Sequence, residues 1–240
     1  MKALAVAMTC GLAILSASPS LAFEVNPLVH LLKPSQEVRD TSLAIKNTSS
    51  EELRIEVDVF ELRLGGDGLS RGMVADDRLF ALPPAAVISP GAERQVRVRW
   101  LDAAPLERDE SFIVAIRQVA NDTTSPLPES GVQMLLTFNA IVHVESAGSK
   151  PALIAEDLEF TDDERLRFTL VNAGWGNAYG ERMRFSLDNG ERYVPIEREL
   201  LVVEGAHLFL PPGESRDVEV SVPEGDWGPP AEVVVDYVER

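Results

Sequence analysis

Two stretches of the sequence repeat one strand-and-turn pattern, and this repeat constrains the fold more than any other feature. In the first stretch, a predicted strand ends at Asn47, and a Ser-Pro-Gly turn at Gly91 starts another. In the second, a predicted strand ends at Asn172, and a Leu-Pro-Pro-Gly turn at Gly213 starts another. The asparagine and the glycine are 44 residues apart in the first copy and 41 in the second. Such self-similarity predicts two copies of one structural unit.

The segments between the turns predict an all-β fold. They are short, rich in Val, Ile, Leu and Phe, and bounded by Pro, Gly and Asn, and they show no helical period. This pattern is typical of two immunoglobulin-like β-sandwich domains. The small-residue segment Ser146–Pro151 is a predicted linker, which gives an N-terminal domain at 23–147 and a C-terminal domain at 148–240.

Residues 1–22 are predicted to be a signal peptide. Lys2 precedes an apolar run from Ala3 to Leu15, and Ser20-Leu21-Ala22 forms a small-x-small cleavage site. The run is too short to span a bilayer comfortably, and no later stretch is long and apolar enough to be a membrane span. Cys10, the one cysteine, lies inside this segment. The mature chain therefore has no disulfide, and its domains must rely on apolar cores.

Composition narrows the functional classes. The formal net charge of −17 argues against nucleic acid or anionic lipid as a partner of the whole surface. The chain has three histidines, and it contains no Gly-x-Ser-x-Gly elbow, zinc-binding His-Glu-x-x-His helix or calcium-loop pattern. We therefore expect no metal and no cofactor, and enzyme activity is the weakest of the classes considered.

The segment 132–144 is predicted to be a long strand that follows a strand at 110–119 and a polar loop. Side chains alternate between the two faces of a strand. One face is apolar throughout, and the opposite face is about half apolar. The apolar face consists of Val132, Met134, Leu136, Phe138, Ala140, Val142 and Val144. Such a strand is either buried between two sheets or available to another chain.

Several features in a fixed order resemble a known family, the periplasmic chaperones of chaperone–usher pilus assembly. The resemblance covers essentially the whole mature chain. It implies two immunoglobulin-like domains in a boomerang arrangement, a periplasmic location, a pilus or fimbrial subunit as partner, and delivery of that subunit to an outer-membrane usher. The features are the strand ending at Asn47, Pro83-Pro84, Ser89-Pro90-Gly91, Val96-Arg97-Val98, Glu110-Ser111-Phe112, the long strand, and Gly225-Asp226-Trp227-Gly228.

The resemblance implies that the long strand is lent to an incomplete pilin fold. Val132, Met134, Leu136 and Phe138 are then the side chains that fill the groove of the subunit. The alternative for the same residues is ordinary core of the first domain. The corresponding alternative function is a structural two-domain module of a cell-surface assembly. An exposed apolar strand also allows the free protein to cap its own edge as a homodimer.

The resemblance also implies an ion network between the domains. The matching residues are Arg97, Glu110 and Asp226. The planar fork of an arginine that bridges two carboxylates tolerates little misalignment, so such a network can fix the angle between domains.

The sequence departs from the family where basic residues of the first strand and the long strand anchor the terminal carboxylate of the pilin. His30 and His143 lie nearest to the expected positions. A protonated histidine pair would bind a carboxylate, but weakly at neutral pH. Lys33 or Arg117 are alternative sources of the charge, and both histidines are equally well explained as partly buried strand residues.

Overall fold

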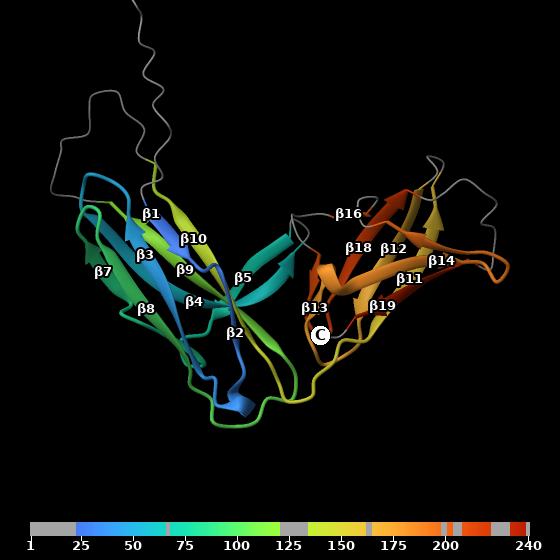
Figure 1. Cartoon of the computed structure of the whole chain (residues 1–240), viewed down its shortest axis with the longest axis horizontal. Coiled ribbons are helices and arrows are strands. Elements are labelled where there is room, and N and C mark those ends of the chain that lie inside the picture. Colours follow the sequence, from blue (N-terminus) through green and yellow to red (C-terminus); the bar gives the residue numbers. More distant parts are fainter. Residues whose placement is uncertain are drawn as a thin grey trace, which may run out of the picture.

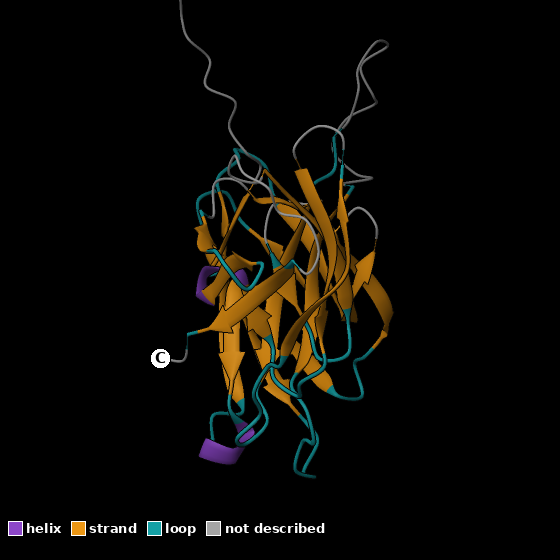
Figure 2. Ribbon diagram, turned by 90° about the vertical axis from the view of Figure 1, so that its right-hand side faces the viewer, coloured by secondary structure: helices purple, strands orange, loops and turns teal. Residues whose placement is uncertain are grey.

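The structure is a computed structural model that describes residues 23–65, 68–120, 134–161, 165–197, 201–203, 208–221 and 231–238. Within these ranges nearly all elements are strands, and two short 3-10 turns, η1 (Pro34–Gln36) and η2 (Gly180–Arg182), are the helical segments. Two β-sandwiches meet at an angle like the arms of a boomerang (Figure 1), and the view from the side shows the strands of both sandwiches (Figure 2). The predicted all-β fold is confirmed.

The first domain is built from two sheets. One sheet has four strands in the order β1 (Phe23–Asn26), β3 (Asp40–Asn47), β8 (Glu93–Trp100) and β6 (Leu79–Leu82). The other has the order β2 (Val29–Leu32), β10 (Thr137–Val144), β9 (Glu110–Val119), β4 (Leu53–Gly65) and β5 (Gly68–Val74), and β7 (Ala85–Ile88) also pairs with β4. The chain crosses from the first sheet to the second between β1 and β2.

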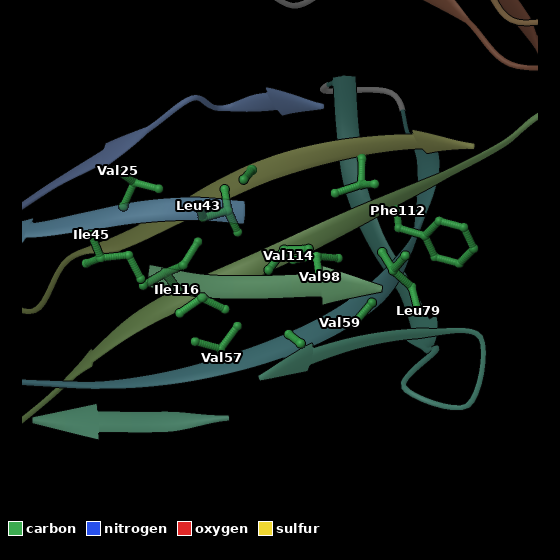
Figure 3. Packing of buried hydrophobic residues seen from close by; sticks show 14 of the residues in the cluster. Val25, Leu43, Ile45, Val57, Val59, Leu79, Val98, Phe112, Val114 and Ile116 are labelled. Carbon is green, nitrogen blue, oxygen red and sulfur yellow. The ribbon is translucent and has the colours of Figure 1, made fainter. Parts of the chain in front are cut away.

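The core of the first domain lies between these two sheets. Figure 3 shows inward-facing side chains of both layers packed together, among them Leu43, Val98 and Val114. Alternate residues of each strand point inward, as the period of two requires. Each large apolar side chain buried in this way contributes about 1.5–3 kcal/mol. Trp100 and Phe112 close one end of the core with their ring centroids 5.7 Å apart.

The second domain repeats the arrangement on a smaller scale. One sheet has the order β11 (Leu153–Phe160), β12 (Arg165–Asn172), β18 (Ser215–Ser221) and β16 (Leu201–Val203). Another has the order β15 (Tyr193–Ile196), β14 (Met183–Asp188) and β19 (Glu232–Tyr237), and β13 (Ala178–Tyr179) pairs with β17 (Phe209–Leu210). A separate cluster of buried residues, including Phe168 and Phe185, forms its core.

The predicted repeat is confirmed at the level of hydrogen bonds. Asn47 and Asn172 are fully buried, and each side-chain amide donates to two backbone carbonyls, at 2.7 and 2.9 Å for Asn47 and at 2.8 and 3.0 Å for Asn172. The backbone N–H of Gly91 donates to the carbonyl of Asn47, and that of Gly213 to the carbonyl of Asn172. Both glycines have positive φ values, 71° and 79°, which glycine adopts at no steric cost. A buried asparagine thus ties the Pro-Gly turn to the strand end in each domain.

Candidate functional site

Strand β10 has a neighbouring strand on both sides along only half of its length. All of it, from Thr137 to Val144, pairs antiparallel with β9. Only the half from Ile141 to Val144 also pairs, in parallel, with β2. The preceding strand β1 belongs to the other sheet, where it pairs with β3. Among the described residues, no strand pairs with Thr137–Ala140 on the side away from β9.

The backbone groups of this half point to the uncovered side at every second residue. The N–H of Ile141 donates to the carbonyl of Leu28, and that of Glu145 to the carbonyl of Leu32. Both bonds run toward β2. Because backbone groups alternate in direction along a strand, those of Thr137 and Asn139 point to the same side, beyond the reach of β2. We refer to the first residues of β10 together with the three residues before it, Met134–Asn139, as the open half. The rest of the strand, Ala140–Val144, is the closed half, and it includes Ala140 because that residue is fully buried.

The apolar face of β10 changes gradually from core to surface. In the closed half, Ala140, Val142 and Val144 are fully buried. In the open half, Phe138 is half-buried and packs edge-on against Phe23 with a centroid distance of 4.8 Å. Leu136 is also half-buried against the core, and Met134 is 76% exposed. Val132 lies outside the described residues.

The strand begins later than predicted. The sequence pattern predicts a strand over 132–144, whereas β10 starts at Thr137. Its partner β9 ends at Val119, and the last backbone bond between the two segments runs from the N–H of Gln118 to the carbonyl of Leu136 at 2.9 Å. Residues 134–136 therefore precede β10 and belong to no strand among the described residues.

The opposite face of β10 lies against the β4–β5 hairpin and the second domain. Ile141 is part of a cluster with Leu62 of β4 and Phe209 of β17, which joins the two domains through apolar contacts. Figure 1 shows β5 on the side of the first domain that faces the second. Asn139, two residues before Ile141, is exposed and accepts a hydrogen bond of 2.6 Å from Arg71 of β5.

The structure does not bring the two predicted histidines together. The register pairs Val142 with His30, which places His30 on the core face, while His143 points to the opposite face. His30 is bonded at 2.7 Å to Thr41 and at 3.0 Å to the carbonyl of Pro27. Its pKa is lowered by burial. A joint carboxylate anchor of both histidines is therefore wrong.

His143 is enclosed between the domains. Its Nδ1 lies 2.8 Å from the hydroxyl of Ser111, and its ring contacts Tyr179 and Phe209 at centroid distances of 5.3 and 4.9 Å. Burial lowers its pKa to about 4. The ring is neutral at physiological pH and cannot supply a positive charge. His30 and His143 are both buried strand residues, which is the alternative interpretation given by the sequence.

Lys33 is the predicted anchor residue that lies in the cleft between the domains. Its ammonium group forms an ion pair with Glu145 at 2.8 Å. It lines a cavity of about 380 Å³ together with Arg182 and Tyr179 of the second domain. Arg117, the other basic candidate, pairs with Glu56 on β4 instead.

Arg97 and Glu110, two members of the predicted ion network, each pair with another residue. Arg97 points outward from β8 in the first sheet and pairs with Asp40 at 3.0 Å, whereas Glu110 starts β9 in the second sheet. Glu110 pairs with Arg78 at 2.7 Å, and the guanidinium of Arg78 also lies 5.1 Å from the centroid of Trp100. The structure thus separates Arg97 from Glu110. Asp226 lies outside the described residues.

Asp109 joins the domains, although no sequence pattern singled it out. Its backbone N–H donates to the carbonyl of Trp175, and one carboxylate oxygen accepts from the N–H of Asn177, both at 2.8 Å. The other oxygen accepts from the N–H of Ser146 at 2.8 Å and from the hydroxyl of Ser149 at 2.5 Å. Burial raises the pKa of Asp109, and these three bonds oppose the rise. One carboxylate thus holds the linker and the second domain.

The described residues lack two further features. They contain no cluster of three or more His, Cys, Asp or Glu side chains that could hold a metal ion. None of their helical segments has the length and hydrophobicity needed to cross a membrane.

The chain is similar to known proteins both in sequence and in fold. Residues 30–144 match the family model described as pili and flagellar-assembly chaperone, PapD N-terminal domain. A search of curated protein sequences gave no match. The crystal structure of the class 5 fimbriae chaperone CfaA is similar with a TM-score of 0.59 and 12% identity, over 91% of this chain and 99% of that one.

Two complexes contain similar chains. One is the complex of CsuC with the tip adhesion subunit CsuE from the archaic chaperone–usher Csu pili of Acinetobacter baumannii, with a TM-score of 0.53, 13% identity, and coverage of 82% of this chain and 89% of that one. The other is the Salmonella enterica SafA pilin in complex with the SafB chaperone, with a TM-score of 0.53, 13% identity, and coverage of 85% and 86%.

These matches extend over both sandwiches and show the fold of a two-domain, immunoglobulin-like protein. The family match covers the first domain, including the half-covered strand β10. The chain thus resembles the pilus-assembly chaperones in fold over both domains and in sequence over residues 30–144.

Proposed function

We infer that this protein holds a pilus or fimbrial subunit by donating the open half of β10 to the sheet of the subunit. The observation that carries this inference is a strand with backbone groups directed at an uncovered edge and apolar side chains on one face. A subunit that lacks one strand exposes an apolar groove and unpaired backbone groups. Addition of the strand pairs those groups, and alternate side chains fill the groove.

The groove-filling residues in this proposal are Met134, Leu136, Phe138 and, before them, Val132. Met134 has almost its whole side chain available, while Leu136 and Phe138 keep part of theirs against the core of the first domain. Each such side chain that becomes fully buried contributes about 1.5–3 kcal/mol to the complex. The subunit would then continue the core of the first domain.

In this proposal Lys33 anchors the terminal carboxylate of the subunit. It carries a cationic ammonium group and lies in the cleft between the domains, beyond the closed half of β10. The carboxylate would exchange with Glu145 as the partner of the ammonium group. Neither buried histidine offers a charge of this kind.

The remaining parts of the proposal follow the family. Residues 1–22 direct the chain to the periplasm, and the loaded chaperone delivers its subunit to an outer-membrane usher without nucleotide, metal or bond-breaking chemistry. The same edge offers a second copy of the chain a place to pair when no subunit is bound.

The first test is capture of the subunit from the periplasm. The tagged wild-type protein, expressed with its native secretion partners, should co-purify a stoichiometric small β-rich protein that is stable only in the complex. Met134→Glu should abolish co-purification without loss of folding, since Met134 is exposed. Ile154→Glu, at an exposed apolar position of the second domain, is the matched control and should bind like the wild type. Recovery of the wild-type protein alone would reject the donor role.

A second measurement separates a chaperone from a structural two-domain module. Hydrogen exchange should be fast at the amides of Thr137 and Asn139 in the free protein and strongly slowed in the complex. In a structural module the open half would be permanently paired or buried within the folded chain itself. Slow exchange of both amides in the isolated monomer would favour that module.

A further inference from the structure

Arg71 of β5 is held beside the open half of β10. The β4–β5 hairpin turns over the outer face of β9 and β10, where Phe60 packs in the same cluster as Ile141. The guanidinium of Arg71 lies 5.4 Å from the centroid of Phe60 and donates a hydrogen bond of 2.6 Å to the side-chain carbonyl of Asn139. These two contacts place an exposed cation at the uncovered edge of the sheet.

The charge of Arg71 is not balanced by these contacts. Asn139 is a neutral amide, and Phe60 offers only the face of its ring. Within the described ranges no carboxylate forms an ion pair with Arg71, whereas Arg63 of the same hairpin pairs with Glu61 at 2.5 Å. The guanidinium of Arg71 is held in place and has no carboxylate partner, although the chain has a net charge of −17. It can therefore bind an anionic group of another molecule.

The geometry of strand addition brings the partner to this cation. Residues directly opposite each other on paired strands point to the same face, with Cβ atoms about 4.5–5.5 Å apart. The partner residue opposite Asn139 would therefore project on the same face as Asn139, toward the guanidinium of Arg71. A carboxylate on that residue, or at a chain end lying there, comes within hydrogen-bond distance.

We propose that Arg71 selects a carboxylate on the strand that pairs with β10. This rests on the proposed function and adds a specificity-determining residue to it. Backbone pairing and groove filling are compatible with many apolar sequences, because they require only that apolar side chains alternate along the strand. An ionic contact at one register position distinguishes subunits and pairing registers that the apolar contacts do not.

The test is a competition for the subunit that co-purifies with the wild-type protein. The purified complex is mixed with an equal amount of a differently tagged variant, and the division of the subunit between the two is measured at about 50 mM and 500 mM NaCl, where screening lengths differ several-fold. Arg71→Gln should capture about fivefold less subunit than the wild type at low salt, the size expected of an exposed ion pair, and should approach parity at high salt.

Two variants control for effects on the hairpin. Arg63→Gln, at another exposed arginine of the same hairpin, should compete equally with the wild type at both salt concentrations. Arg71→Lys keeps the charge and should retain most of the capture. Equal competition by Arg71→Gln, or a deficit that salt does not change, would overturn the proposal. Failure of the wild type to capture any subunit would instead reject the proposed function.

The source of the carboxylate is identified from the side of the subunit. Replacement of its acidic residues by amides, one at a time, should remove the salt-dependent advantage of the wild type over Arg71→Gln at a single position. If a Gly-Gly extension of its C-terminus removes the advantage instead, the bound group is the terminal carboxylate, and Arg71 rather than Lys33 holds it. If neither change alters the salt-dependent advantage of the wild type, Arg71 does not bind a carboxylate of the subunit.

Discussion

The closed and open halves of β10 have similar composition and opposite environments. Both carry apolar residues at every second position, yet Val142 is fully buried, whereas Met134 is 76% exposed. The difference comes from the neighbours, because β2 covers β10 only from Ile141 onward and β9 ends at Val119. Whether an apolar segment is buried or exposed is thus decided by the lengths of the neighbouring strands.

A charge introduced into the closed half should have the largest effect on stability. Val142→Glu buries an unpaired carboxylate in the core of the first domain, and we expect a loss of about 3–5 kcal/mol in the free energy of unfolding. Urea unfolding followed by tryptophan fluorescence measures it. Met134→Glu, on the same face of the chain in the open half, should change stability by no more than about 0.5 kcal/mol. Similar losses in both variants would remove the distinction between the halves.

Acid should weaken the closed half through His143. Its pKa is about 4 in the folded protein against an ordinary value of 6.5, so the unfolded chain takes up a proton first as the pH falls. The stabilisation is complete above about pH 6.5 and is lost between there and about pH 4, which amounts to about 2–3 kcal/mol.

His143→Gln provides the comparison for this titration. Glutamine can still bond Ser111 and does not titrate, so the stability of the variant should fall less between pH 7.5 and pH 4.5. Part of the decrease remains, since the lowered pKa of His30 acts in the same direction, while the raised pKa of Asp109 acts against it. Parallel stability curves for the variant and the wild type would show that His143 is not the titrating group.

Truncations within the open half should reveal the gradient from core to surface. Leu136→Ala should cost about 1 kcal/mol, below the range of fully buried leucines, because the side chain is only half-buried. Met134→Ala should lie within about 0.5 kcal/mol of the wild type. Thermal unfolding of both variants gives the comparison. An equal cost at the two positions would mean that the core of the first domain extends further along the chain than the structure shows.

The sequence predicts those parts of the fold that depend on local chemistry. Asn47 and Asn172, with the glycines 44 and 41 residues later, are recognisable because a buried amide and a positive φ admit few other residues. The alternation along β10 likewise predicts that Ala140, Val142 and Val144 share one face.

The parts that depend on long-range register were not predictable. His30 and His143 lie near each other along paired strands, but a shift of one residue decides whether they share a face, and the register of β2 against β10 has no local signal. The family resemblance points to Arg97, the arginine after the Pro-Gly turn, and no local pattern points to Arg78. Arg78 lies in the turn before β6, and only the packing of the two sheets brings it to Glu110.

The crossing of the chain between β1 and β2 acts as a stop for any strand that pairs with β10. A partner that adds along the open half meets the N-terminal end of β2, at Val29, because β2 already occupies the edge from Ile141 onward. Its paired segment can therefore slide toward the second domain only to that point, and a terminal carboxylate that reaches Lys33 must lie on the chain beyond the paired segment. The distance from the stop to a given partner residue is then constant. The stop therefore fixes the register of the partner strand, which the apolar side chains alone would leave undefined.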